Sequence, residues 1–331
     1  MFFHFRTDTY VVVARCFERG QQMTHWGRNF TGYGRRAPHI SWPGDALVAV
    51  NLVIVYEEGS EYSLIEGHGR NEGWGEYAFT VEPPIRDLGT ETHFEFGSRV
   101  GIWRLARMLD DLGVKASISA CALALERNPE VPAWMNEAGH DLLGHGWRWF
   151  EAFAQSREEE REHLDRAVES YQRMLGYRPI GWNQRSYPSV NTFDLLVAER
   201  GFLYTSDPCN DEVPYFVPDG QGGRMLVMPY SKTFNDSRFL VSPGYANPTD
   251  FATDVVAGMD YLVRDAQEIG PRMMTVAVHA RWTGQPNRAS GLRRIIEHGL
   301  ATPGVAFLRR DDMARHFLAH HGDLGVMEPQ I

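Results

Sequence analysis

The chain has 331 residues but only three cysteines, Cys16, Cys121 and Cys209. They are too few and too scattered for a disulfide framework or a cysteine-based zinc site. A reducing cytoplasm is therefore the expected compartment. No apolar run is long enough to cross a bilayer, which argues against an integral membrane protein.

Basic residues are also in deficit, because 33 Lys and Arg against 43 Asp and Glu give a formal charge of −10. A phosphate-tracking surface needs the opposite balance, so we expect no nucleic-acid partner and no membrane partner. Several familiar motifs are missing: the Walker phosphate loop, HExxH, GxSxG and CxxC. The glycines at 67, 69, 73 and 75 lack a following helix start, which argues against a dinucleotide site. A small-molecule substrate is the remaining expectation.

The first 30 residues are predicted to be an N-terminal arm or extension. They mix aromatics and arginines with a short apolar patch at 10–14, which is too short for a secretory signal. Whether Met1 or Met23 is the start stays open. Residues 31–331 are expected to form one catalytic domain.

From residue 47 onward, strand and helix patterns alternate. The run 47–56 is almost wholly apolar and predicts a strand buried on both faces. Further strands are expected at 116–122, 140–145, 179–182, 203–205, 224–228, 273–279 and 305–308. Helical patterns lie between them at 99–109, 132–138, 157–175, 193–200, 251–266 and 291–298. The alternation predicts an α/β fold with a parallel sheet, either closed as a barrel or left open.

Polar residues collect where these strands end, which is where α/β barrels build their active sites. Glu57 and Glu58 follow the first strand and point to opposite faces, so one of them can serve as a general base. A solvated acidic loop is the alternative. His145 lies between glycines that let other groups approach closely. His279 ends an apolar strand, well placed to donate a proton to a leaving amine, although strand histidines are often core residues.

Other candidates have two interpretations each. Trp147, Arg148 and Trp149 form either a stacking wall for a planar ligand or ordinary packing. Arg185 either binds an anionic group or orients an acid, or it makes a surface salt bridge. Asp207 either braces a histidine or Arg185, or caps a turn.

These clusters resemble the polysaccharide deacetylase superfamily and, within it, the allantoinase-type branch, whose members open a cyclic ureide. The resemblance covers most of the chain, from about Gly32 to His316. It implies a distorted (β/α) barrel of about seven parallel strands, and it leaves a homo-oligomer open. The motifs that carry it are Gly32-Tyr33-Gly34, Trp42-Pro43-Gly44-Asp45, Tyr56-Glu57-Glu58-Gly59, Glu95-Phe96-Gly97-Ser98-Arg99, Gly139-His140-Asp141, His145-Gly146, Arg148-Trp149, Gly181-Trp182, Ser206-Asp207 and the loop of His279, Arg281, Gly284 and Pro286.

By position, the resemblance places Glu57 at the family's general base and Glu58 at a metal-binding carboxylate. His145 matches the first metal histidine, but the second would fall at Trp149, which cannot bind a metal. Because a catalytic zinc usually has three protein ligands, we expect either no required cofactor or a zinc ion held weakly by Glu58 and His145.

In the same way, His279 matches the family's late histidine, which acts as general acid. Arg185 matches the arginine of the third motif, and Asp207 lies near the acidic residue that orients its partner. Arg281 falls in the same loop as His279 and is expected, with Trp147, Arg148, Trp149 and Asp207, to contact substrate.

We therefore expect a hydrolase of non-peptide C–N bonds in a small cyclic amide, imide or ureide. Glu57 would activate water, His279 would protonate the leaving nitrogen, and His145 with Arg185 or Arg148 would hold the carbonyl. A metal-dependent N-deacetylase of amino sugars or peptidoglycan fragments is the first alternative. A carbohydrate-binding barrel without activity is the second. The substrate and the oligomeric state are not determined by the sequence.

Overall fold

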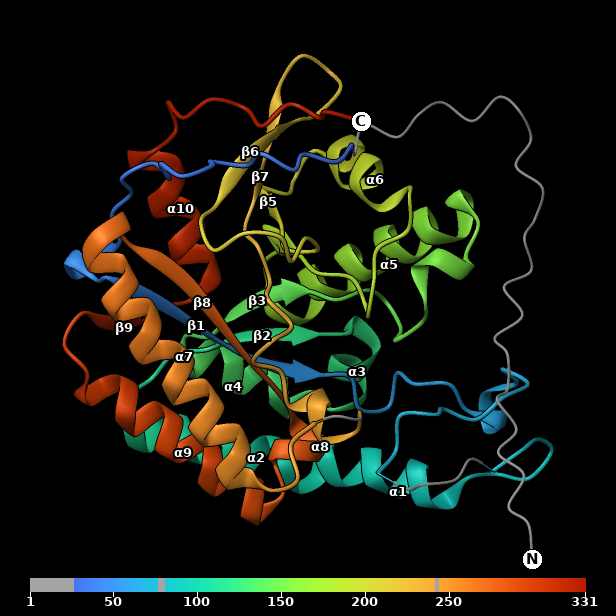
Figure 1. Ribbon diagram of the computed structural model, residues 1–331. Helices are drawn as coiled ribbons and strands as arrows, with labels where there is room; N and C mark the ends of the chain where they lie inside the picture. The colour runs from blue at the N-terminus through green and yellow to red at the C-terminus, as the bar shows by residue number, and fades with distance from the viewer. Residues whose placement is uncertain (1–26, 77–80, 242–243) are drawn as a thin grey trace, which may run out of the picture.

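A computed structural model of the protein describes residues 27–76, 81–241 and 244–331. Most of the predicted N-terminal arm, including both candidate start methionines, lies outside the described residues. From Gly27 the chain runs beside the C-terminal segment (Figure 1). The backbone N–H of Arg28 donates to the carbonyl of Ile331 at 2.8 Å, and the side chain of Asn29 donates to the carbonyl of Glu328.

A curled, mostly parallel sheet forms a half-barrel at the centre of the fold. In the described residues it has nine strands, in the order β6-β7-β5-β4-β3-β2-β1-β8, with β9 paired to β1. Only β6 runs antiparallel, against β7. The strands are β1 (Val48–Tyr56), β2 (Ser117–Ala120), β3 (Asp141–Gly144), β4 (Gly181–Trp182), β5 (Tyr204–Thr205), β6 (Tyr215–Pro218), β7 (Arg224–Val227), β8 (Arg272–His279) and β9 (Val305–Phe307).

Strand β1 pairs with three other strands, and all nine of its residues are buried. It pairs with β8 along almost its whole length, while its first half pairs with β9 and its second half with β2. A strand enclosed in this way must be apolar on both faces, as the run 47–56 predicted. Its register with β8 places Val55 opposite His279, so Glu57 leaves the sheet beside that histidine.

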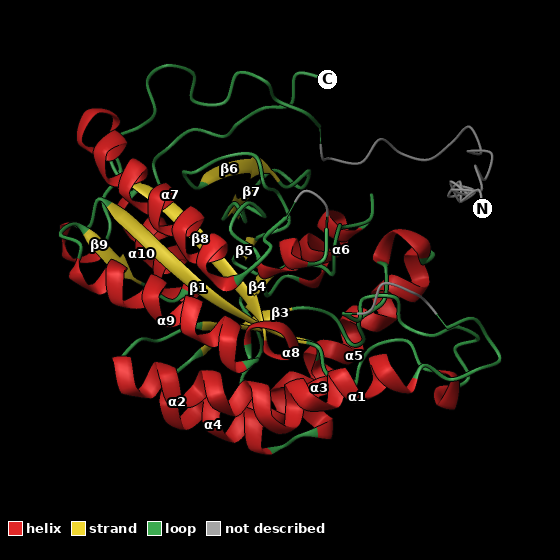
Figure 2. Ribbon diagram, turned by 60° about the horizontal axis from the view of Figure 1, so that its bottom comes forward, coloured by secondary structure: helices red, strands yellow, loops and turns green. Residues whose placement is uncertain are grey.

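Helices cover the outside of the curled sheet (Figures 1 and 2). They are α1 (Leu88–Phe96), α2 (Ile102–Leu112), α3 (Ala122–Arg127), α4 (Glu130–Ala138), α5 (Arg157–Leu175), α6 (Thr192–Glu199), α7 (Pro248–Ile269), α8 (Ala280–Thr283), α9 (Pro286–Ala301) and α10 (Arg310–His320). The longest predicted charged helix, 157–175, has the observed bounds of α5. A capping box of Ser156 and Glu159 starts it, and Gly176 in the left-handed conformation ends it.

The predicted α/β barrel is confirmed as a half-barrel, and each predicted strand and helix has a counterpart. Five elements were not predicted: α1, α3, β6, α8 and α10. Of these, α8 matters most, because the stretch after His279 was expected to be a loop. Figure 2 shows α8 at the carboxyl ends of β1 and β8.

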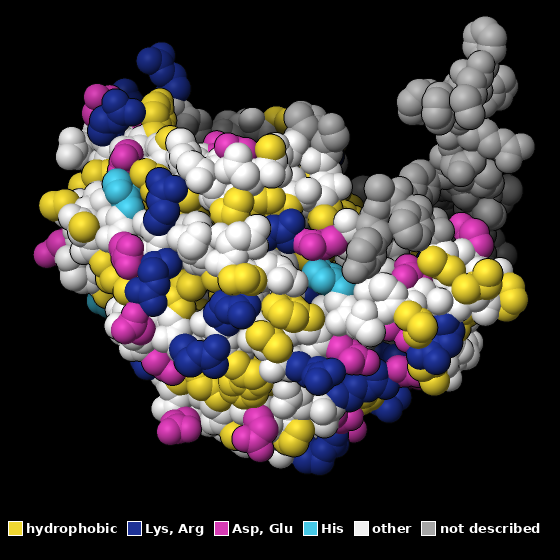
Figure 3. Space-filling view, turned by 90° about the horizontal axis from the view of Figure 1, so that it is seen from below, with side chains coloured by type: hydrophobic (Ala, Val, Ile, Leu, Met, Phe, Trp, Pro, Cys, Tyr) yellow, Lys and Arg dark blue, Asp and Glu magenta, His cyan; other side chains and the backbone are white. Residues whose placement is uncertain are grey.

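The outer face formed by helices carries charges of both signs. In the view of Figure 3, dark blue and magenta side chains are interspersed with apolar ones. Pairs such as Arg293 of α9 with Asp111 of α2, at 2.7 Å, tie neighbouring helices together. Within the described part of the chain, no helix combines the length and the apolar character needed to span a bilayer.

Candidate active site

The ends of strands β1, β3 and β8 bring three predicted residues together. Glu57 follows β1, His145 follows β3, and His279 is the last residue of β8. Oε1 of Glu57 lies 3.1 Å from Nε2 of His145, and Oε2 lies 3.9 Å from Nε2 of His279. The carboxylate therefore lies between two imidazoles, all three side chains being almost fully buried.

Glu57 is held as a carboxylate by its neighbours. Burial by itself would raise its pKa, but the charge of Arg281, the hydrogen bond from His145 and the charge of His279 together lower the pKa of Glu57 to about 2. Nη1 of Arg281 lies 2.8 Å from Oε2 of Glu57. The group is ionised at neutral pH and available to accept a proton.

His279 is oriented by Asp236. Nδ1 of His279 lies 2.6 Å from Oδ1 of Asp236, whose Oδ2 accepts from the backbone N–H of His279 at 2.8 Å. The hydroxyl of Thr283 also donates to Oδ2, at 2.6 Å. With Nδ1 engaged by a buried carboxylate, Nε2 faces Glu57 and is the nitrogen that can exchange a proton.

His145 is fixed in the same manner by a carbonyl. Its Nδ1 lies 2.6 Å from the backbone oxygen of Asn183, which can only accept, so Nδ1 carries a hydrogen. The hydrogen bond between Nε2 and Glu57 then requires a second proton on the ring or a proton on the carboxylate. One proton is therefore shared between Nε2 of His145 and Oε1 of Glu57.

Glu58 is turned away from this group. Its Oε2 accepts from the backbone N–H of Glu57 at 2.8 Å, and its Oε1 accepts from the backbone N–H of Arg281 at 3.0 Å. Burial raises the pKa of Glu58, although the charge of Arg281 opposes this effect. Glu58 therefore ties the end of β1 to the start of α8, and its oxygens are used by the backbone.

The predicted metal pair is not brought together, because His145 contacts Glu57 and Glu58 is bound to two amides. Trp149 has no lone pair to offer, and the guanidinium of Arg281 lies 2.8 and 3.6 Å from the two carboxylates. In residues 27–76, 81–241 and 244–331, no group of three or more His, Cys, Asp and Glu side chains is arranged to hold a metal ion. The donor set does not fit a catalytic zinc.

Arg185 and Trp149 form a buried stack next to the site. Cζ of Arg185 lies 3.6 Å from the ring centroid of Trp149, and Nη1 donates to the Trp149 carbonyl. Nη2 lies 3.3 Å from both oxygens of Glu72 and 3.5 Å from Glu151. Arg185 thus anchors the loop that carries Glu72, and its charge is directed at these carboxylates, not at Glu57.

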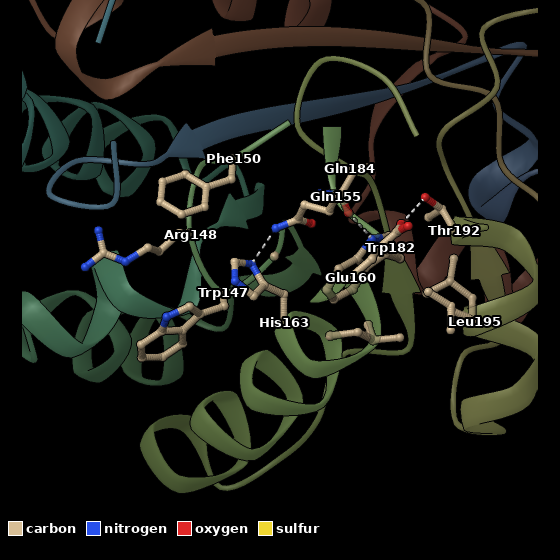
Figure 4. A pocket seen from close by; sticks show the side chains of 13 residues that line it. Trp147, Arg148, Phe150, Gln155, Glu160, His163, Trp182, Gln184, Thr192 and Leu195 are labelled. Atoms are coloured by element: carbon tan, nitrogen blue, oxygen red, sulfur yellow. Dashed lines mark hydrogen bonds between the residues drawn. The ribbon is translucent and has the colours of Figure 1, made fainter. Parts of the chain in front are cut away.

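Trp147 and Arg148 line a separate cavity (Figure 4). This cavity lies between β4, α5 and α6 and has room for about one water molecule. Arg166 stacks over Trp147 at 3.8 Å, while Arg148 pairs with Glu66. The predicted stacking wall is therefore divided, and only Trp149 faces the carboxylate site.

Asp207 is half-buried beside the loop after β4. It accepts from the backbone N–H of Gln184 at 2.6 Å and from the hydroxyl of Thr205 at 3.3 Å. Burial raises its pKa to about 6, although these hydrogen bonds oppose the effect. The alternative prediction, that Asp207 braces a histidine or Arg185, does not describe its bonds in the structure. Asp236 holds the histidine instead.

The sequence reasoning missed Asp236, Thr283 and the backbone oxygen of Asn183. Asp236 lies 43 residues before His279 and is brought to it by a short segment alongside β8, where the N–H of Ala277 donates to the carbonyl of Phe234 at 3.0 Å. The only available signal was chemical, since a strand-end histidine commonly has a carboxylate partner.

Known proteins resemble this chain over most of its length. The polysaccharide deacetylase family profile matches residues 92–191. A Schizosaccharomyces pombe protein named after this family is 32% identical over 313 residues, covering 89% of this chain and 98% of the relative. The chain belongs to the polysaccharide deacetylase family.

Two solved structures share the fold of this family member closely. One is a probable polysaccharide deacetylase from Pseudomonas aeruginosa PAO1, with 34% identity and a TM-score of 0.85 over 90% of this chain and 100% of the other. The second is PuuE allantoinase, with 34% identity and a TM-score of 0.86 over 90% of this chain and 99% of the other. The half-barrel is therefore the fold of this family.

Proposed function

We propose that the protein hydrolyses a C–N bond in a small cyclic amide, imide or ureide, with Glu57 as general base and His279 as general acid. The observation that carries this proposal is the position of the Glu57 carboxylate between two imidazoles, with His279 braced by Asp236. One acceptor and one donor of protons at the same buried point are what amide hydrolysis requires.

In the proposed reaction, Glu57 takes a proton from water as the water oxygen bonds to the ring carbonyl carbon. The carbonyl π electrons move to oxygen and form a tetrahedral oxyanion. When that intermediate collapses, the C–N bond breaks, its electron pair stays on nitrogen, and His279 gives that nitrogen its Nε2 proton. The products are an amine nitrogen on the opened ring and a carboxylic acid, which ionises to a carboxylate and releases one proton to solvent. The proton on Glu57 passes to Nε2 of His279, which restores both groups to their starting states.

Asp236 makes His279 a suitable acid, because a buried carboxylate that accepts at Nδ1 stabilises the imidazolium. His145 is a positioning residue in this scheme, since it fixes the orientation of Glu57 through Oε1 at 3.1 Å. Its own Nδ1 is committed to the Asn183 carbonyl. Removal of His145 would free the carboxylate to rotate away from water.

The surroundings favour a compact substrate. Phe94, Trp149 and Trp282 are buried aromatic residues grouped around Arg281, within 4.2 to 5.0 Å of its guanidinium carbon. Similarity to PuuE allantoinase along nearly the whole chain supports a cyclic ureide such as allantoin. The unsuitability of the donor set for zinc weighs against a metal-dependent deacetylase of sugars.

Ring opening of allantoin, hydantoin, dihydrouracil and succinimide by the purified protein tests the proposal, with acetate release from N-acetylglucosamine oligomers measured in parallel. Turnover of a cyclic substrate that Glu57→Gln lowers by about 10²–10⁴ is the expected result. Glu160→Gln is the matched control, because Glu160 is a buried glutamate on α5 that accepts from the Ser189 and Thr192 hydroxyls. Release of acetate without ring opening would replace this function with the deacetylase.

A further inference from the structure

Arg281 is a buried cation that is ion-paired with Glu57 but makes no side-chain hydrogen bond among the described residues. Its side chain is fully buried, yet Nε, Nη1 and Nη2 have no hydrogen-bond partner in the part of the chain that the structure describes. Nη1 lies 2.8 Å from Oε2 of Glu57, but the contact is poorly aligned, and Oε2 is itself without a hydrogen bond there. A buried guanidinium left in this state is costly unless a ligand supplies acceptors.

Three aromatic rings pack around the guanidinium of Arg281. The rings of Phe94, Trp149 and Trp282 lie 4.4, 5.0 and 4.2 Å from its Cζ. These rings lie against the guanidinium, while its N–H groups remain available to an acceptor near Glu57. The two neighbouring carboxylates raise the pKa of Arg281 even though burial opposes them, so the charge persists.

The backbone holds this cation in a fixed position relative to the proposed acid and base. Arg281 lies two residues after His279, and its own N–H donates to Glu58 at 3.0 Å. Gly101 and Gly284 allow α8 to pack closely against the helical turn 97–101 that leads into α2, since a Cβ on either would lie within 2.1 Å of the Ala280 carbonyl oxygen. A preorganised charge of this kind is the arrangement that stabilises an oxyanion.

We infer that Arg281 donates to the oxygen of the carbonyl under attack and stabilises the negative charge that develops on it. This inference deepens the proposed function and rests on it. In this arrangement the carbonyl oxygen of a neutral amide, imide or ureide accepts a hydrogen bond from Nη1 or Nη2. The carbonyl carbon then lies beside the water that Glu57 activates. No additional group is consumed, because the charge on oxygen returns to the carbonyl when the C–N bond breaks.

Kinetics separates this role from a purely structural one. We expect Arg281→Met to lower kcat by about 10²–10³ with a much smaller change in KM, and Arg281→Lys to recover part of the loss. If Arg281 only lowered the pKa of Glu57, kcat would return to the wild-type value at alkaline pH, and that outcome would overturn the inference. Arg224→Met is the control for losing a guanidinium stacked on a ring, because Arg224 of the far strand β7 lies over the ring of Phe216 of β6 at 4.1 Å.

A spectroscopic measurement keeps the test independent of turnover. Hydantoin labelled with ¹³C at its ring carbonyl is bound to His279→Gln, which retains Glu57 and Arg281, and to the double variant with Arg281→Met. We expect the carbonyl stretch to move to lower wavenumber in the first protein and to lose that shift in the second. An equal shift in both, or none in either, would overturn the assignment.

The two proposals can fail separately. A wild-type protein that opens the ring while Arg281→Met keeps its kcat would remove Arg281 from the reaction and leave the function standing. A carbonyl shift that depends on Arg281, in a protein that opens no ring, would support the binding role and reject the hydrolase. Thermal unfolding of each variant shows whether a loss of activity comes from a folded protein.

Discussion

Asp236 and His279 form a two-point contact in which one carboxylate binds both the ring and the backbone of the same histidine. Oδ1 lies 2.6 Å from Nδ1, and Oδ2 accepts the His279 N–H at 2.8 Å. The contact exists because the segment containing Phe234 and Asn235 runs parallel to β8 beside Ala277. It fixes the ring, and it selects the tautomer that leaves Nε2 for chemistry.

Asp236→Asn should therefore reduce kcat strongly. Asparagine keeps the shape but presents only one acceptor and no charge, so the imidazolium of His279 loses its stabilisation. The expected loss is about 10²–10⁴ in kcat with little change in KM, measured on the best cyclic substrate. Asp141→Asn is the control, since Asp141 is also a buried aspartate but begins β3, at the opposite end of the strands. Equal effects of both variants would indicate general damage to the fold.

Removal of divalent metals should leave the rate unchanged within about twofold, because Glu58 is used by two backbone amides and position 149 is a tryptophan. Dialysis against EDTA, followed by metal analysis and a kinetic assay, makes this test. Trp149→His should not create tight zinc binding, since Glu58 stays bound to the backbone. Loss of one zinc per chain together with activity, and its return on adding zinc, would contradict this prediction.

Gly101→Ala should destabilise the protein through the position of α8. A Cβ at this residue would lie 2.1 Å from the carbonyl oxygen of Ala280, which is backbone and cannot move aside cheaply. We expect a loss of about 1–3 kcal/mol in the free energy of unfolding, measured by denaturant titration, and a lower kcat because Arg281 moves with α8. At Gly325 an added Cβ meets nothing within 4 Å, so Gly325→Ala should change neither quantity.

Stability should fall as the pH rises from about 4 to about 8, because this is the range between the unfolded and the folded pKa of Asp311. Burial and the proximity of Asp141 raise the pKa of Asp311, and burial likewise raises the pKa of Asp141. A carboxyl group with a raised pKa binds more protons in the folded protein than in the unfolded chain. Its stabilising contribution is complete below the unfolded pKa and is lost as the pH rises through the folded one.

Asp311→Asn should flatten that dependence, because the amide can still accept from the hydroxyl of Tyr204, which lies 2.8 Å from Oδ1 of Asp311, and does not ionise. The measurement is the melting temperature of both proteins across this pH range. The same slope in the variant as in the wild type would show that the pair is not responsible.

The sequence by itself determined the main alternation of strands and helices, although it missed α1, α3, β6, α8 and α10. Buried strands such as β1 need apolar residues on both faces. Long helices such as α5 begin at a capping box and end at a glycine, and both signals are visible in the sequence. Those signals are local, so they can be read without the fold. The candidates at the strand ends, Glu57, His145 and His279, follow from the same rule, since parallel strands place their carboxyl ends at one edge.

Which of the other polar residues join them was decided only by the tertiary structure. The sequence offered Asp207 as the partner of a histidine and gave no signal for Asp236. In the structure the segment at 234–236 runs beside β8, whereas Asp207 binds the loop after β4. Arg185 and Arg281 are similar in sequence context. In the structure Arg185 forms ion pairs with Glu72 and Glu151, whereas Arg281 lies beside Glu57.

The physical reason is that charge partners within a folded chain are chosen by distance in space. The contact of Arg281 with Glu57 joins residues more than 200 positions apart and depends on the pairing of β1 with β8 and on the close packing of α8. No local pattern encodes such a contact. The alternating pattern determined the α/β class with a parallel sheet, the family resemblance indicated the barrel, and the packing at the ends of the strands determined which charged groups lie beside Glu57.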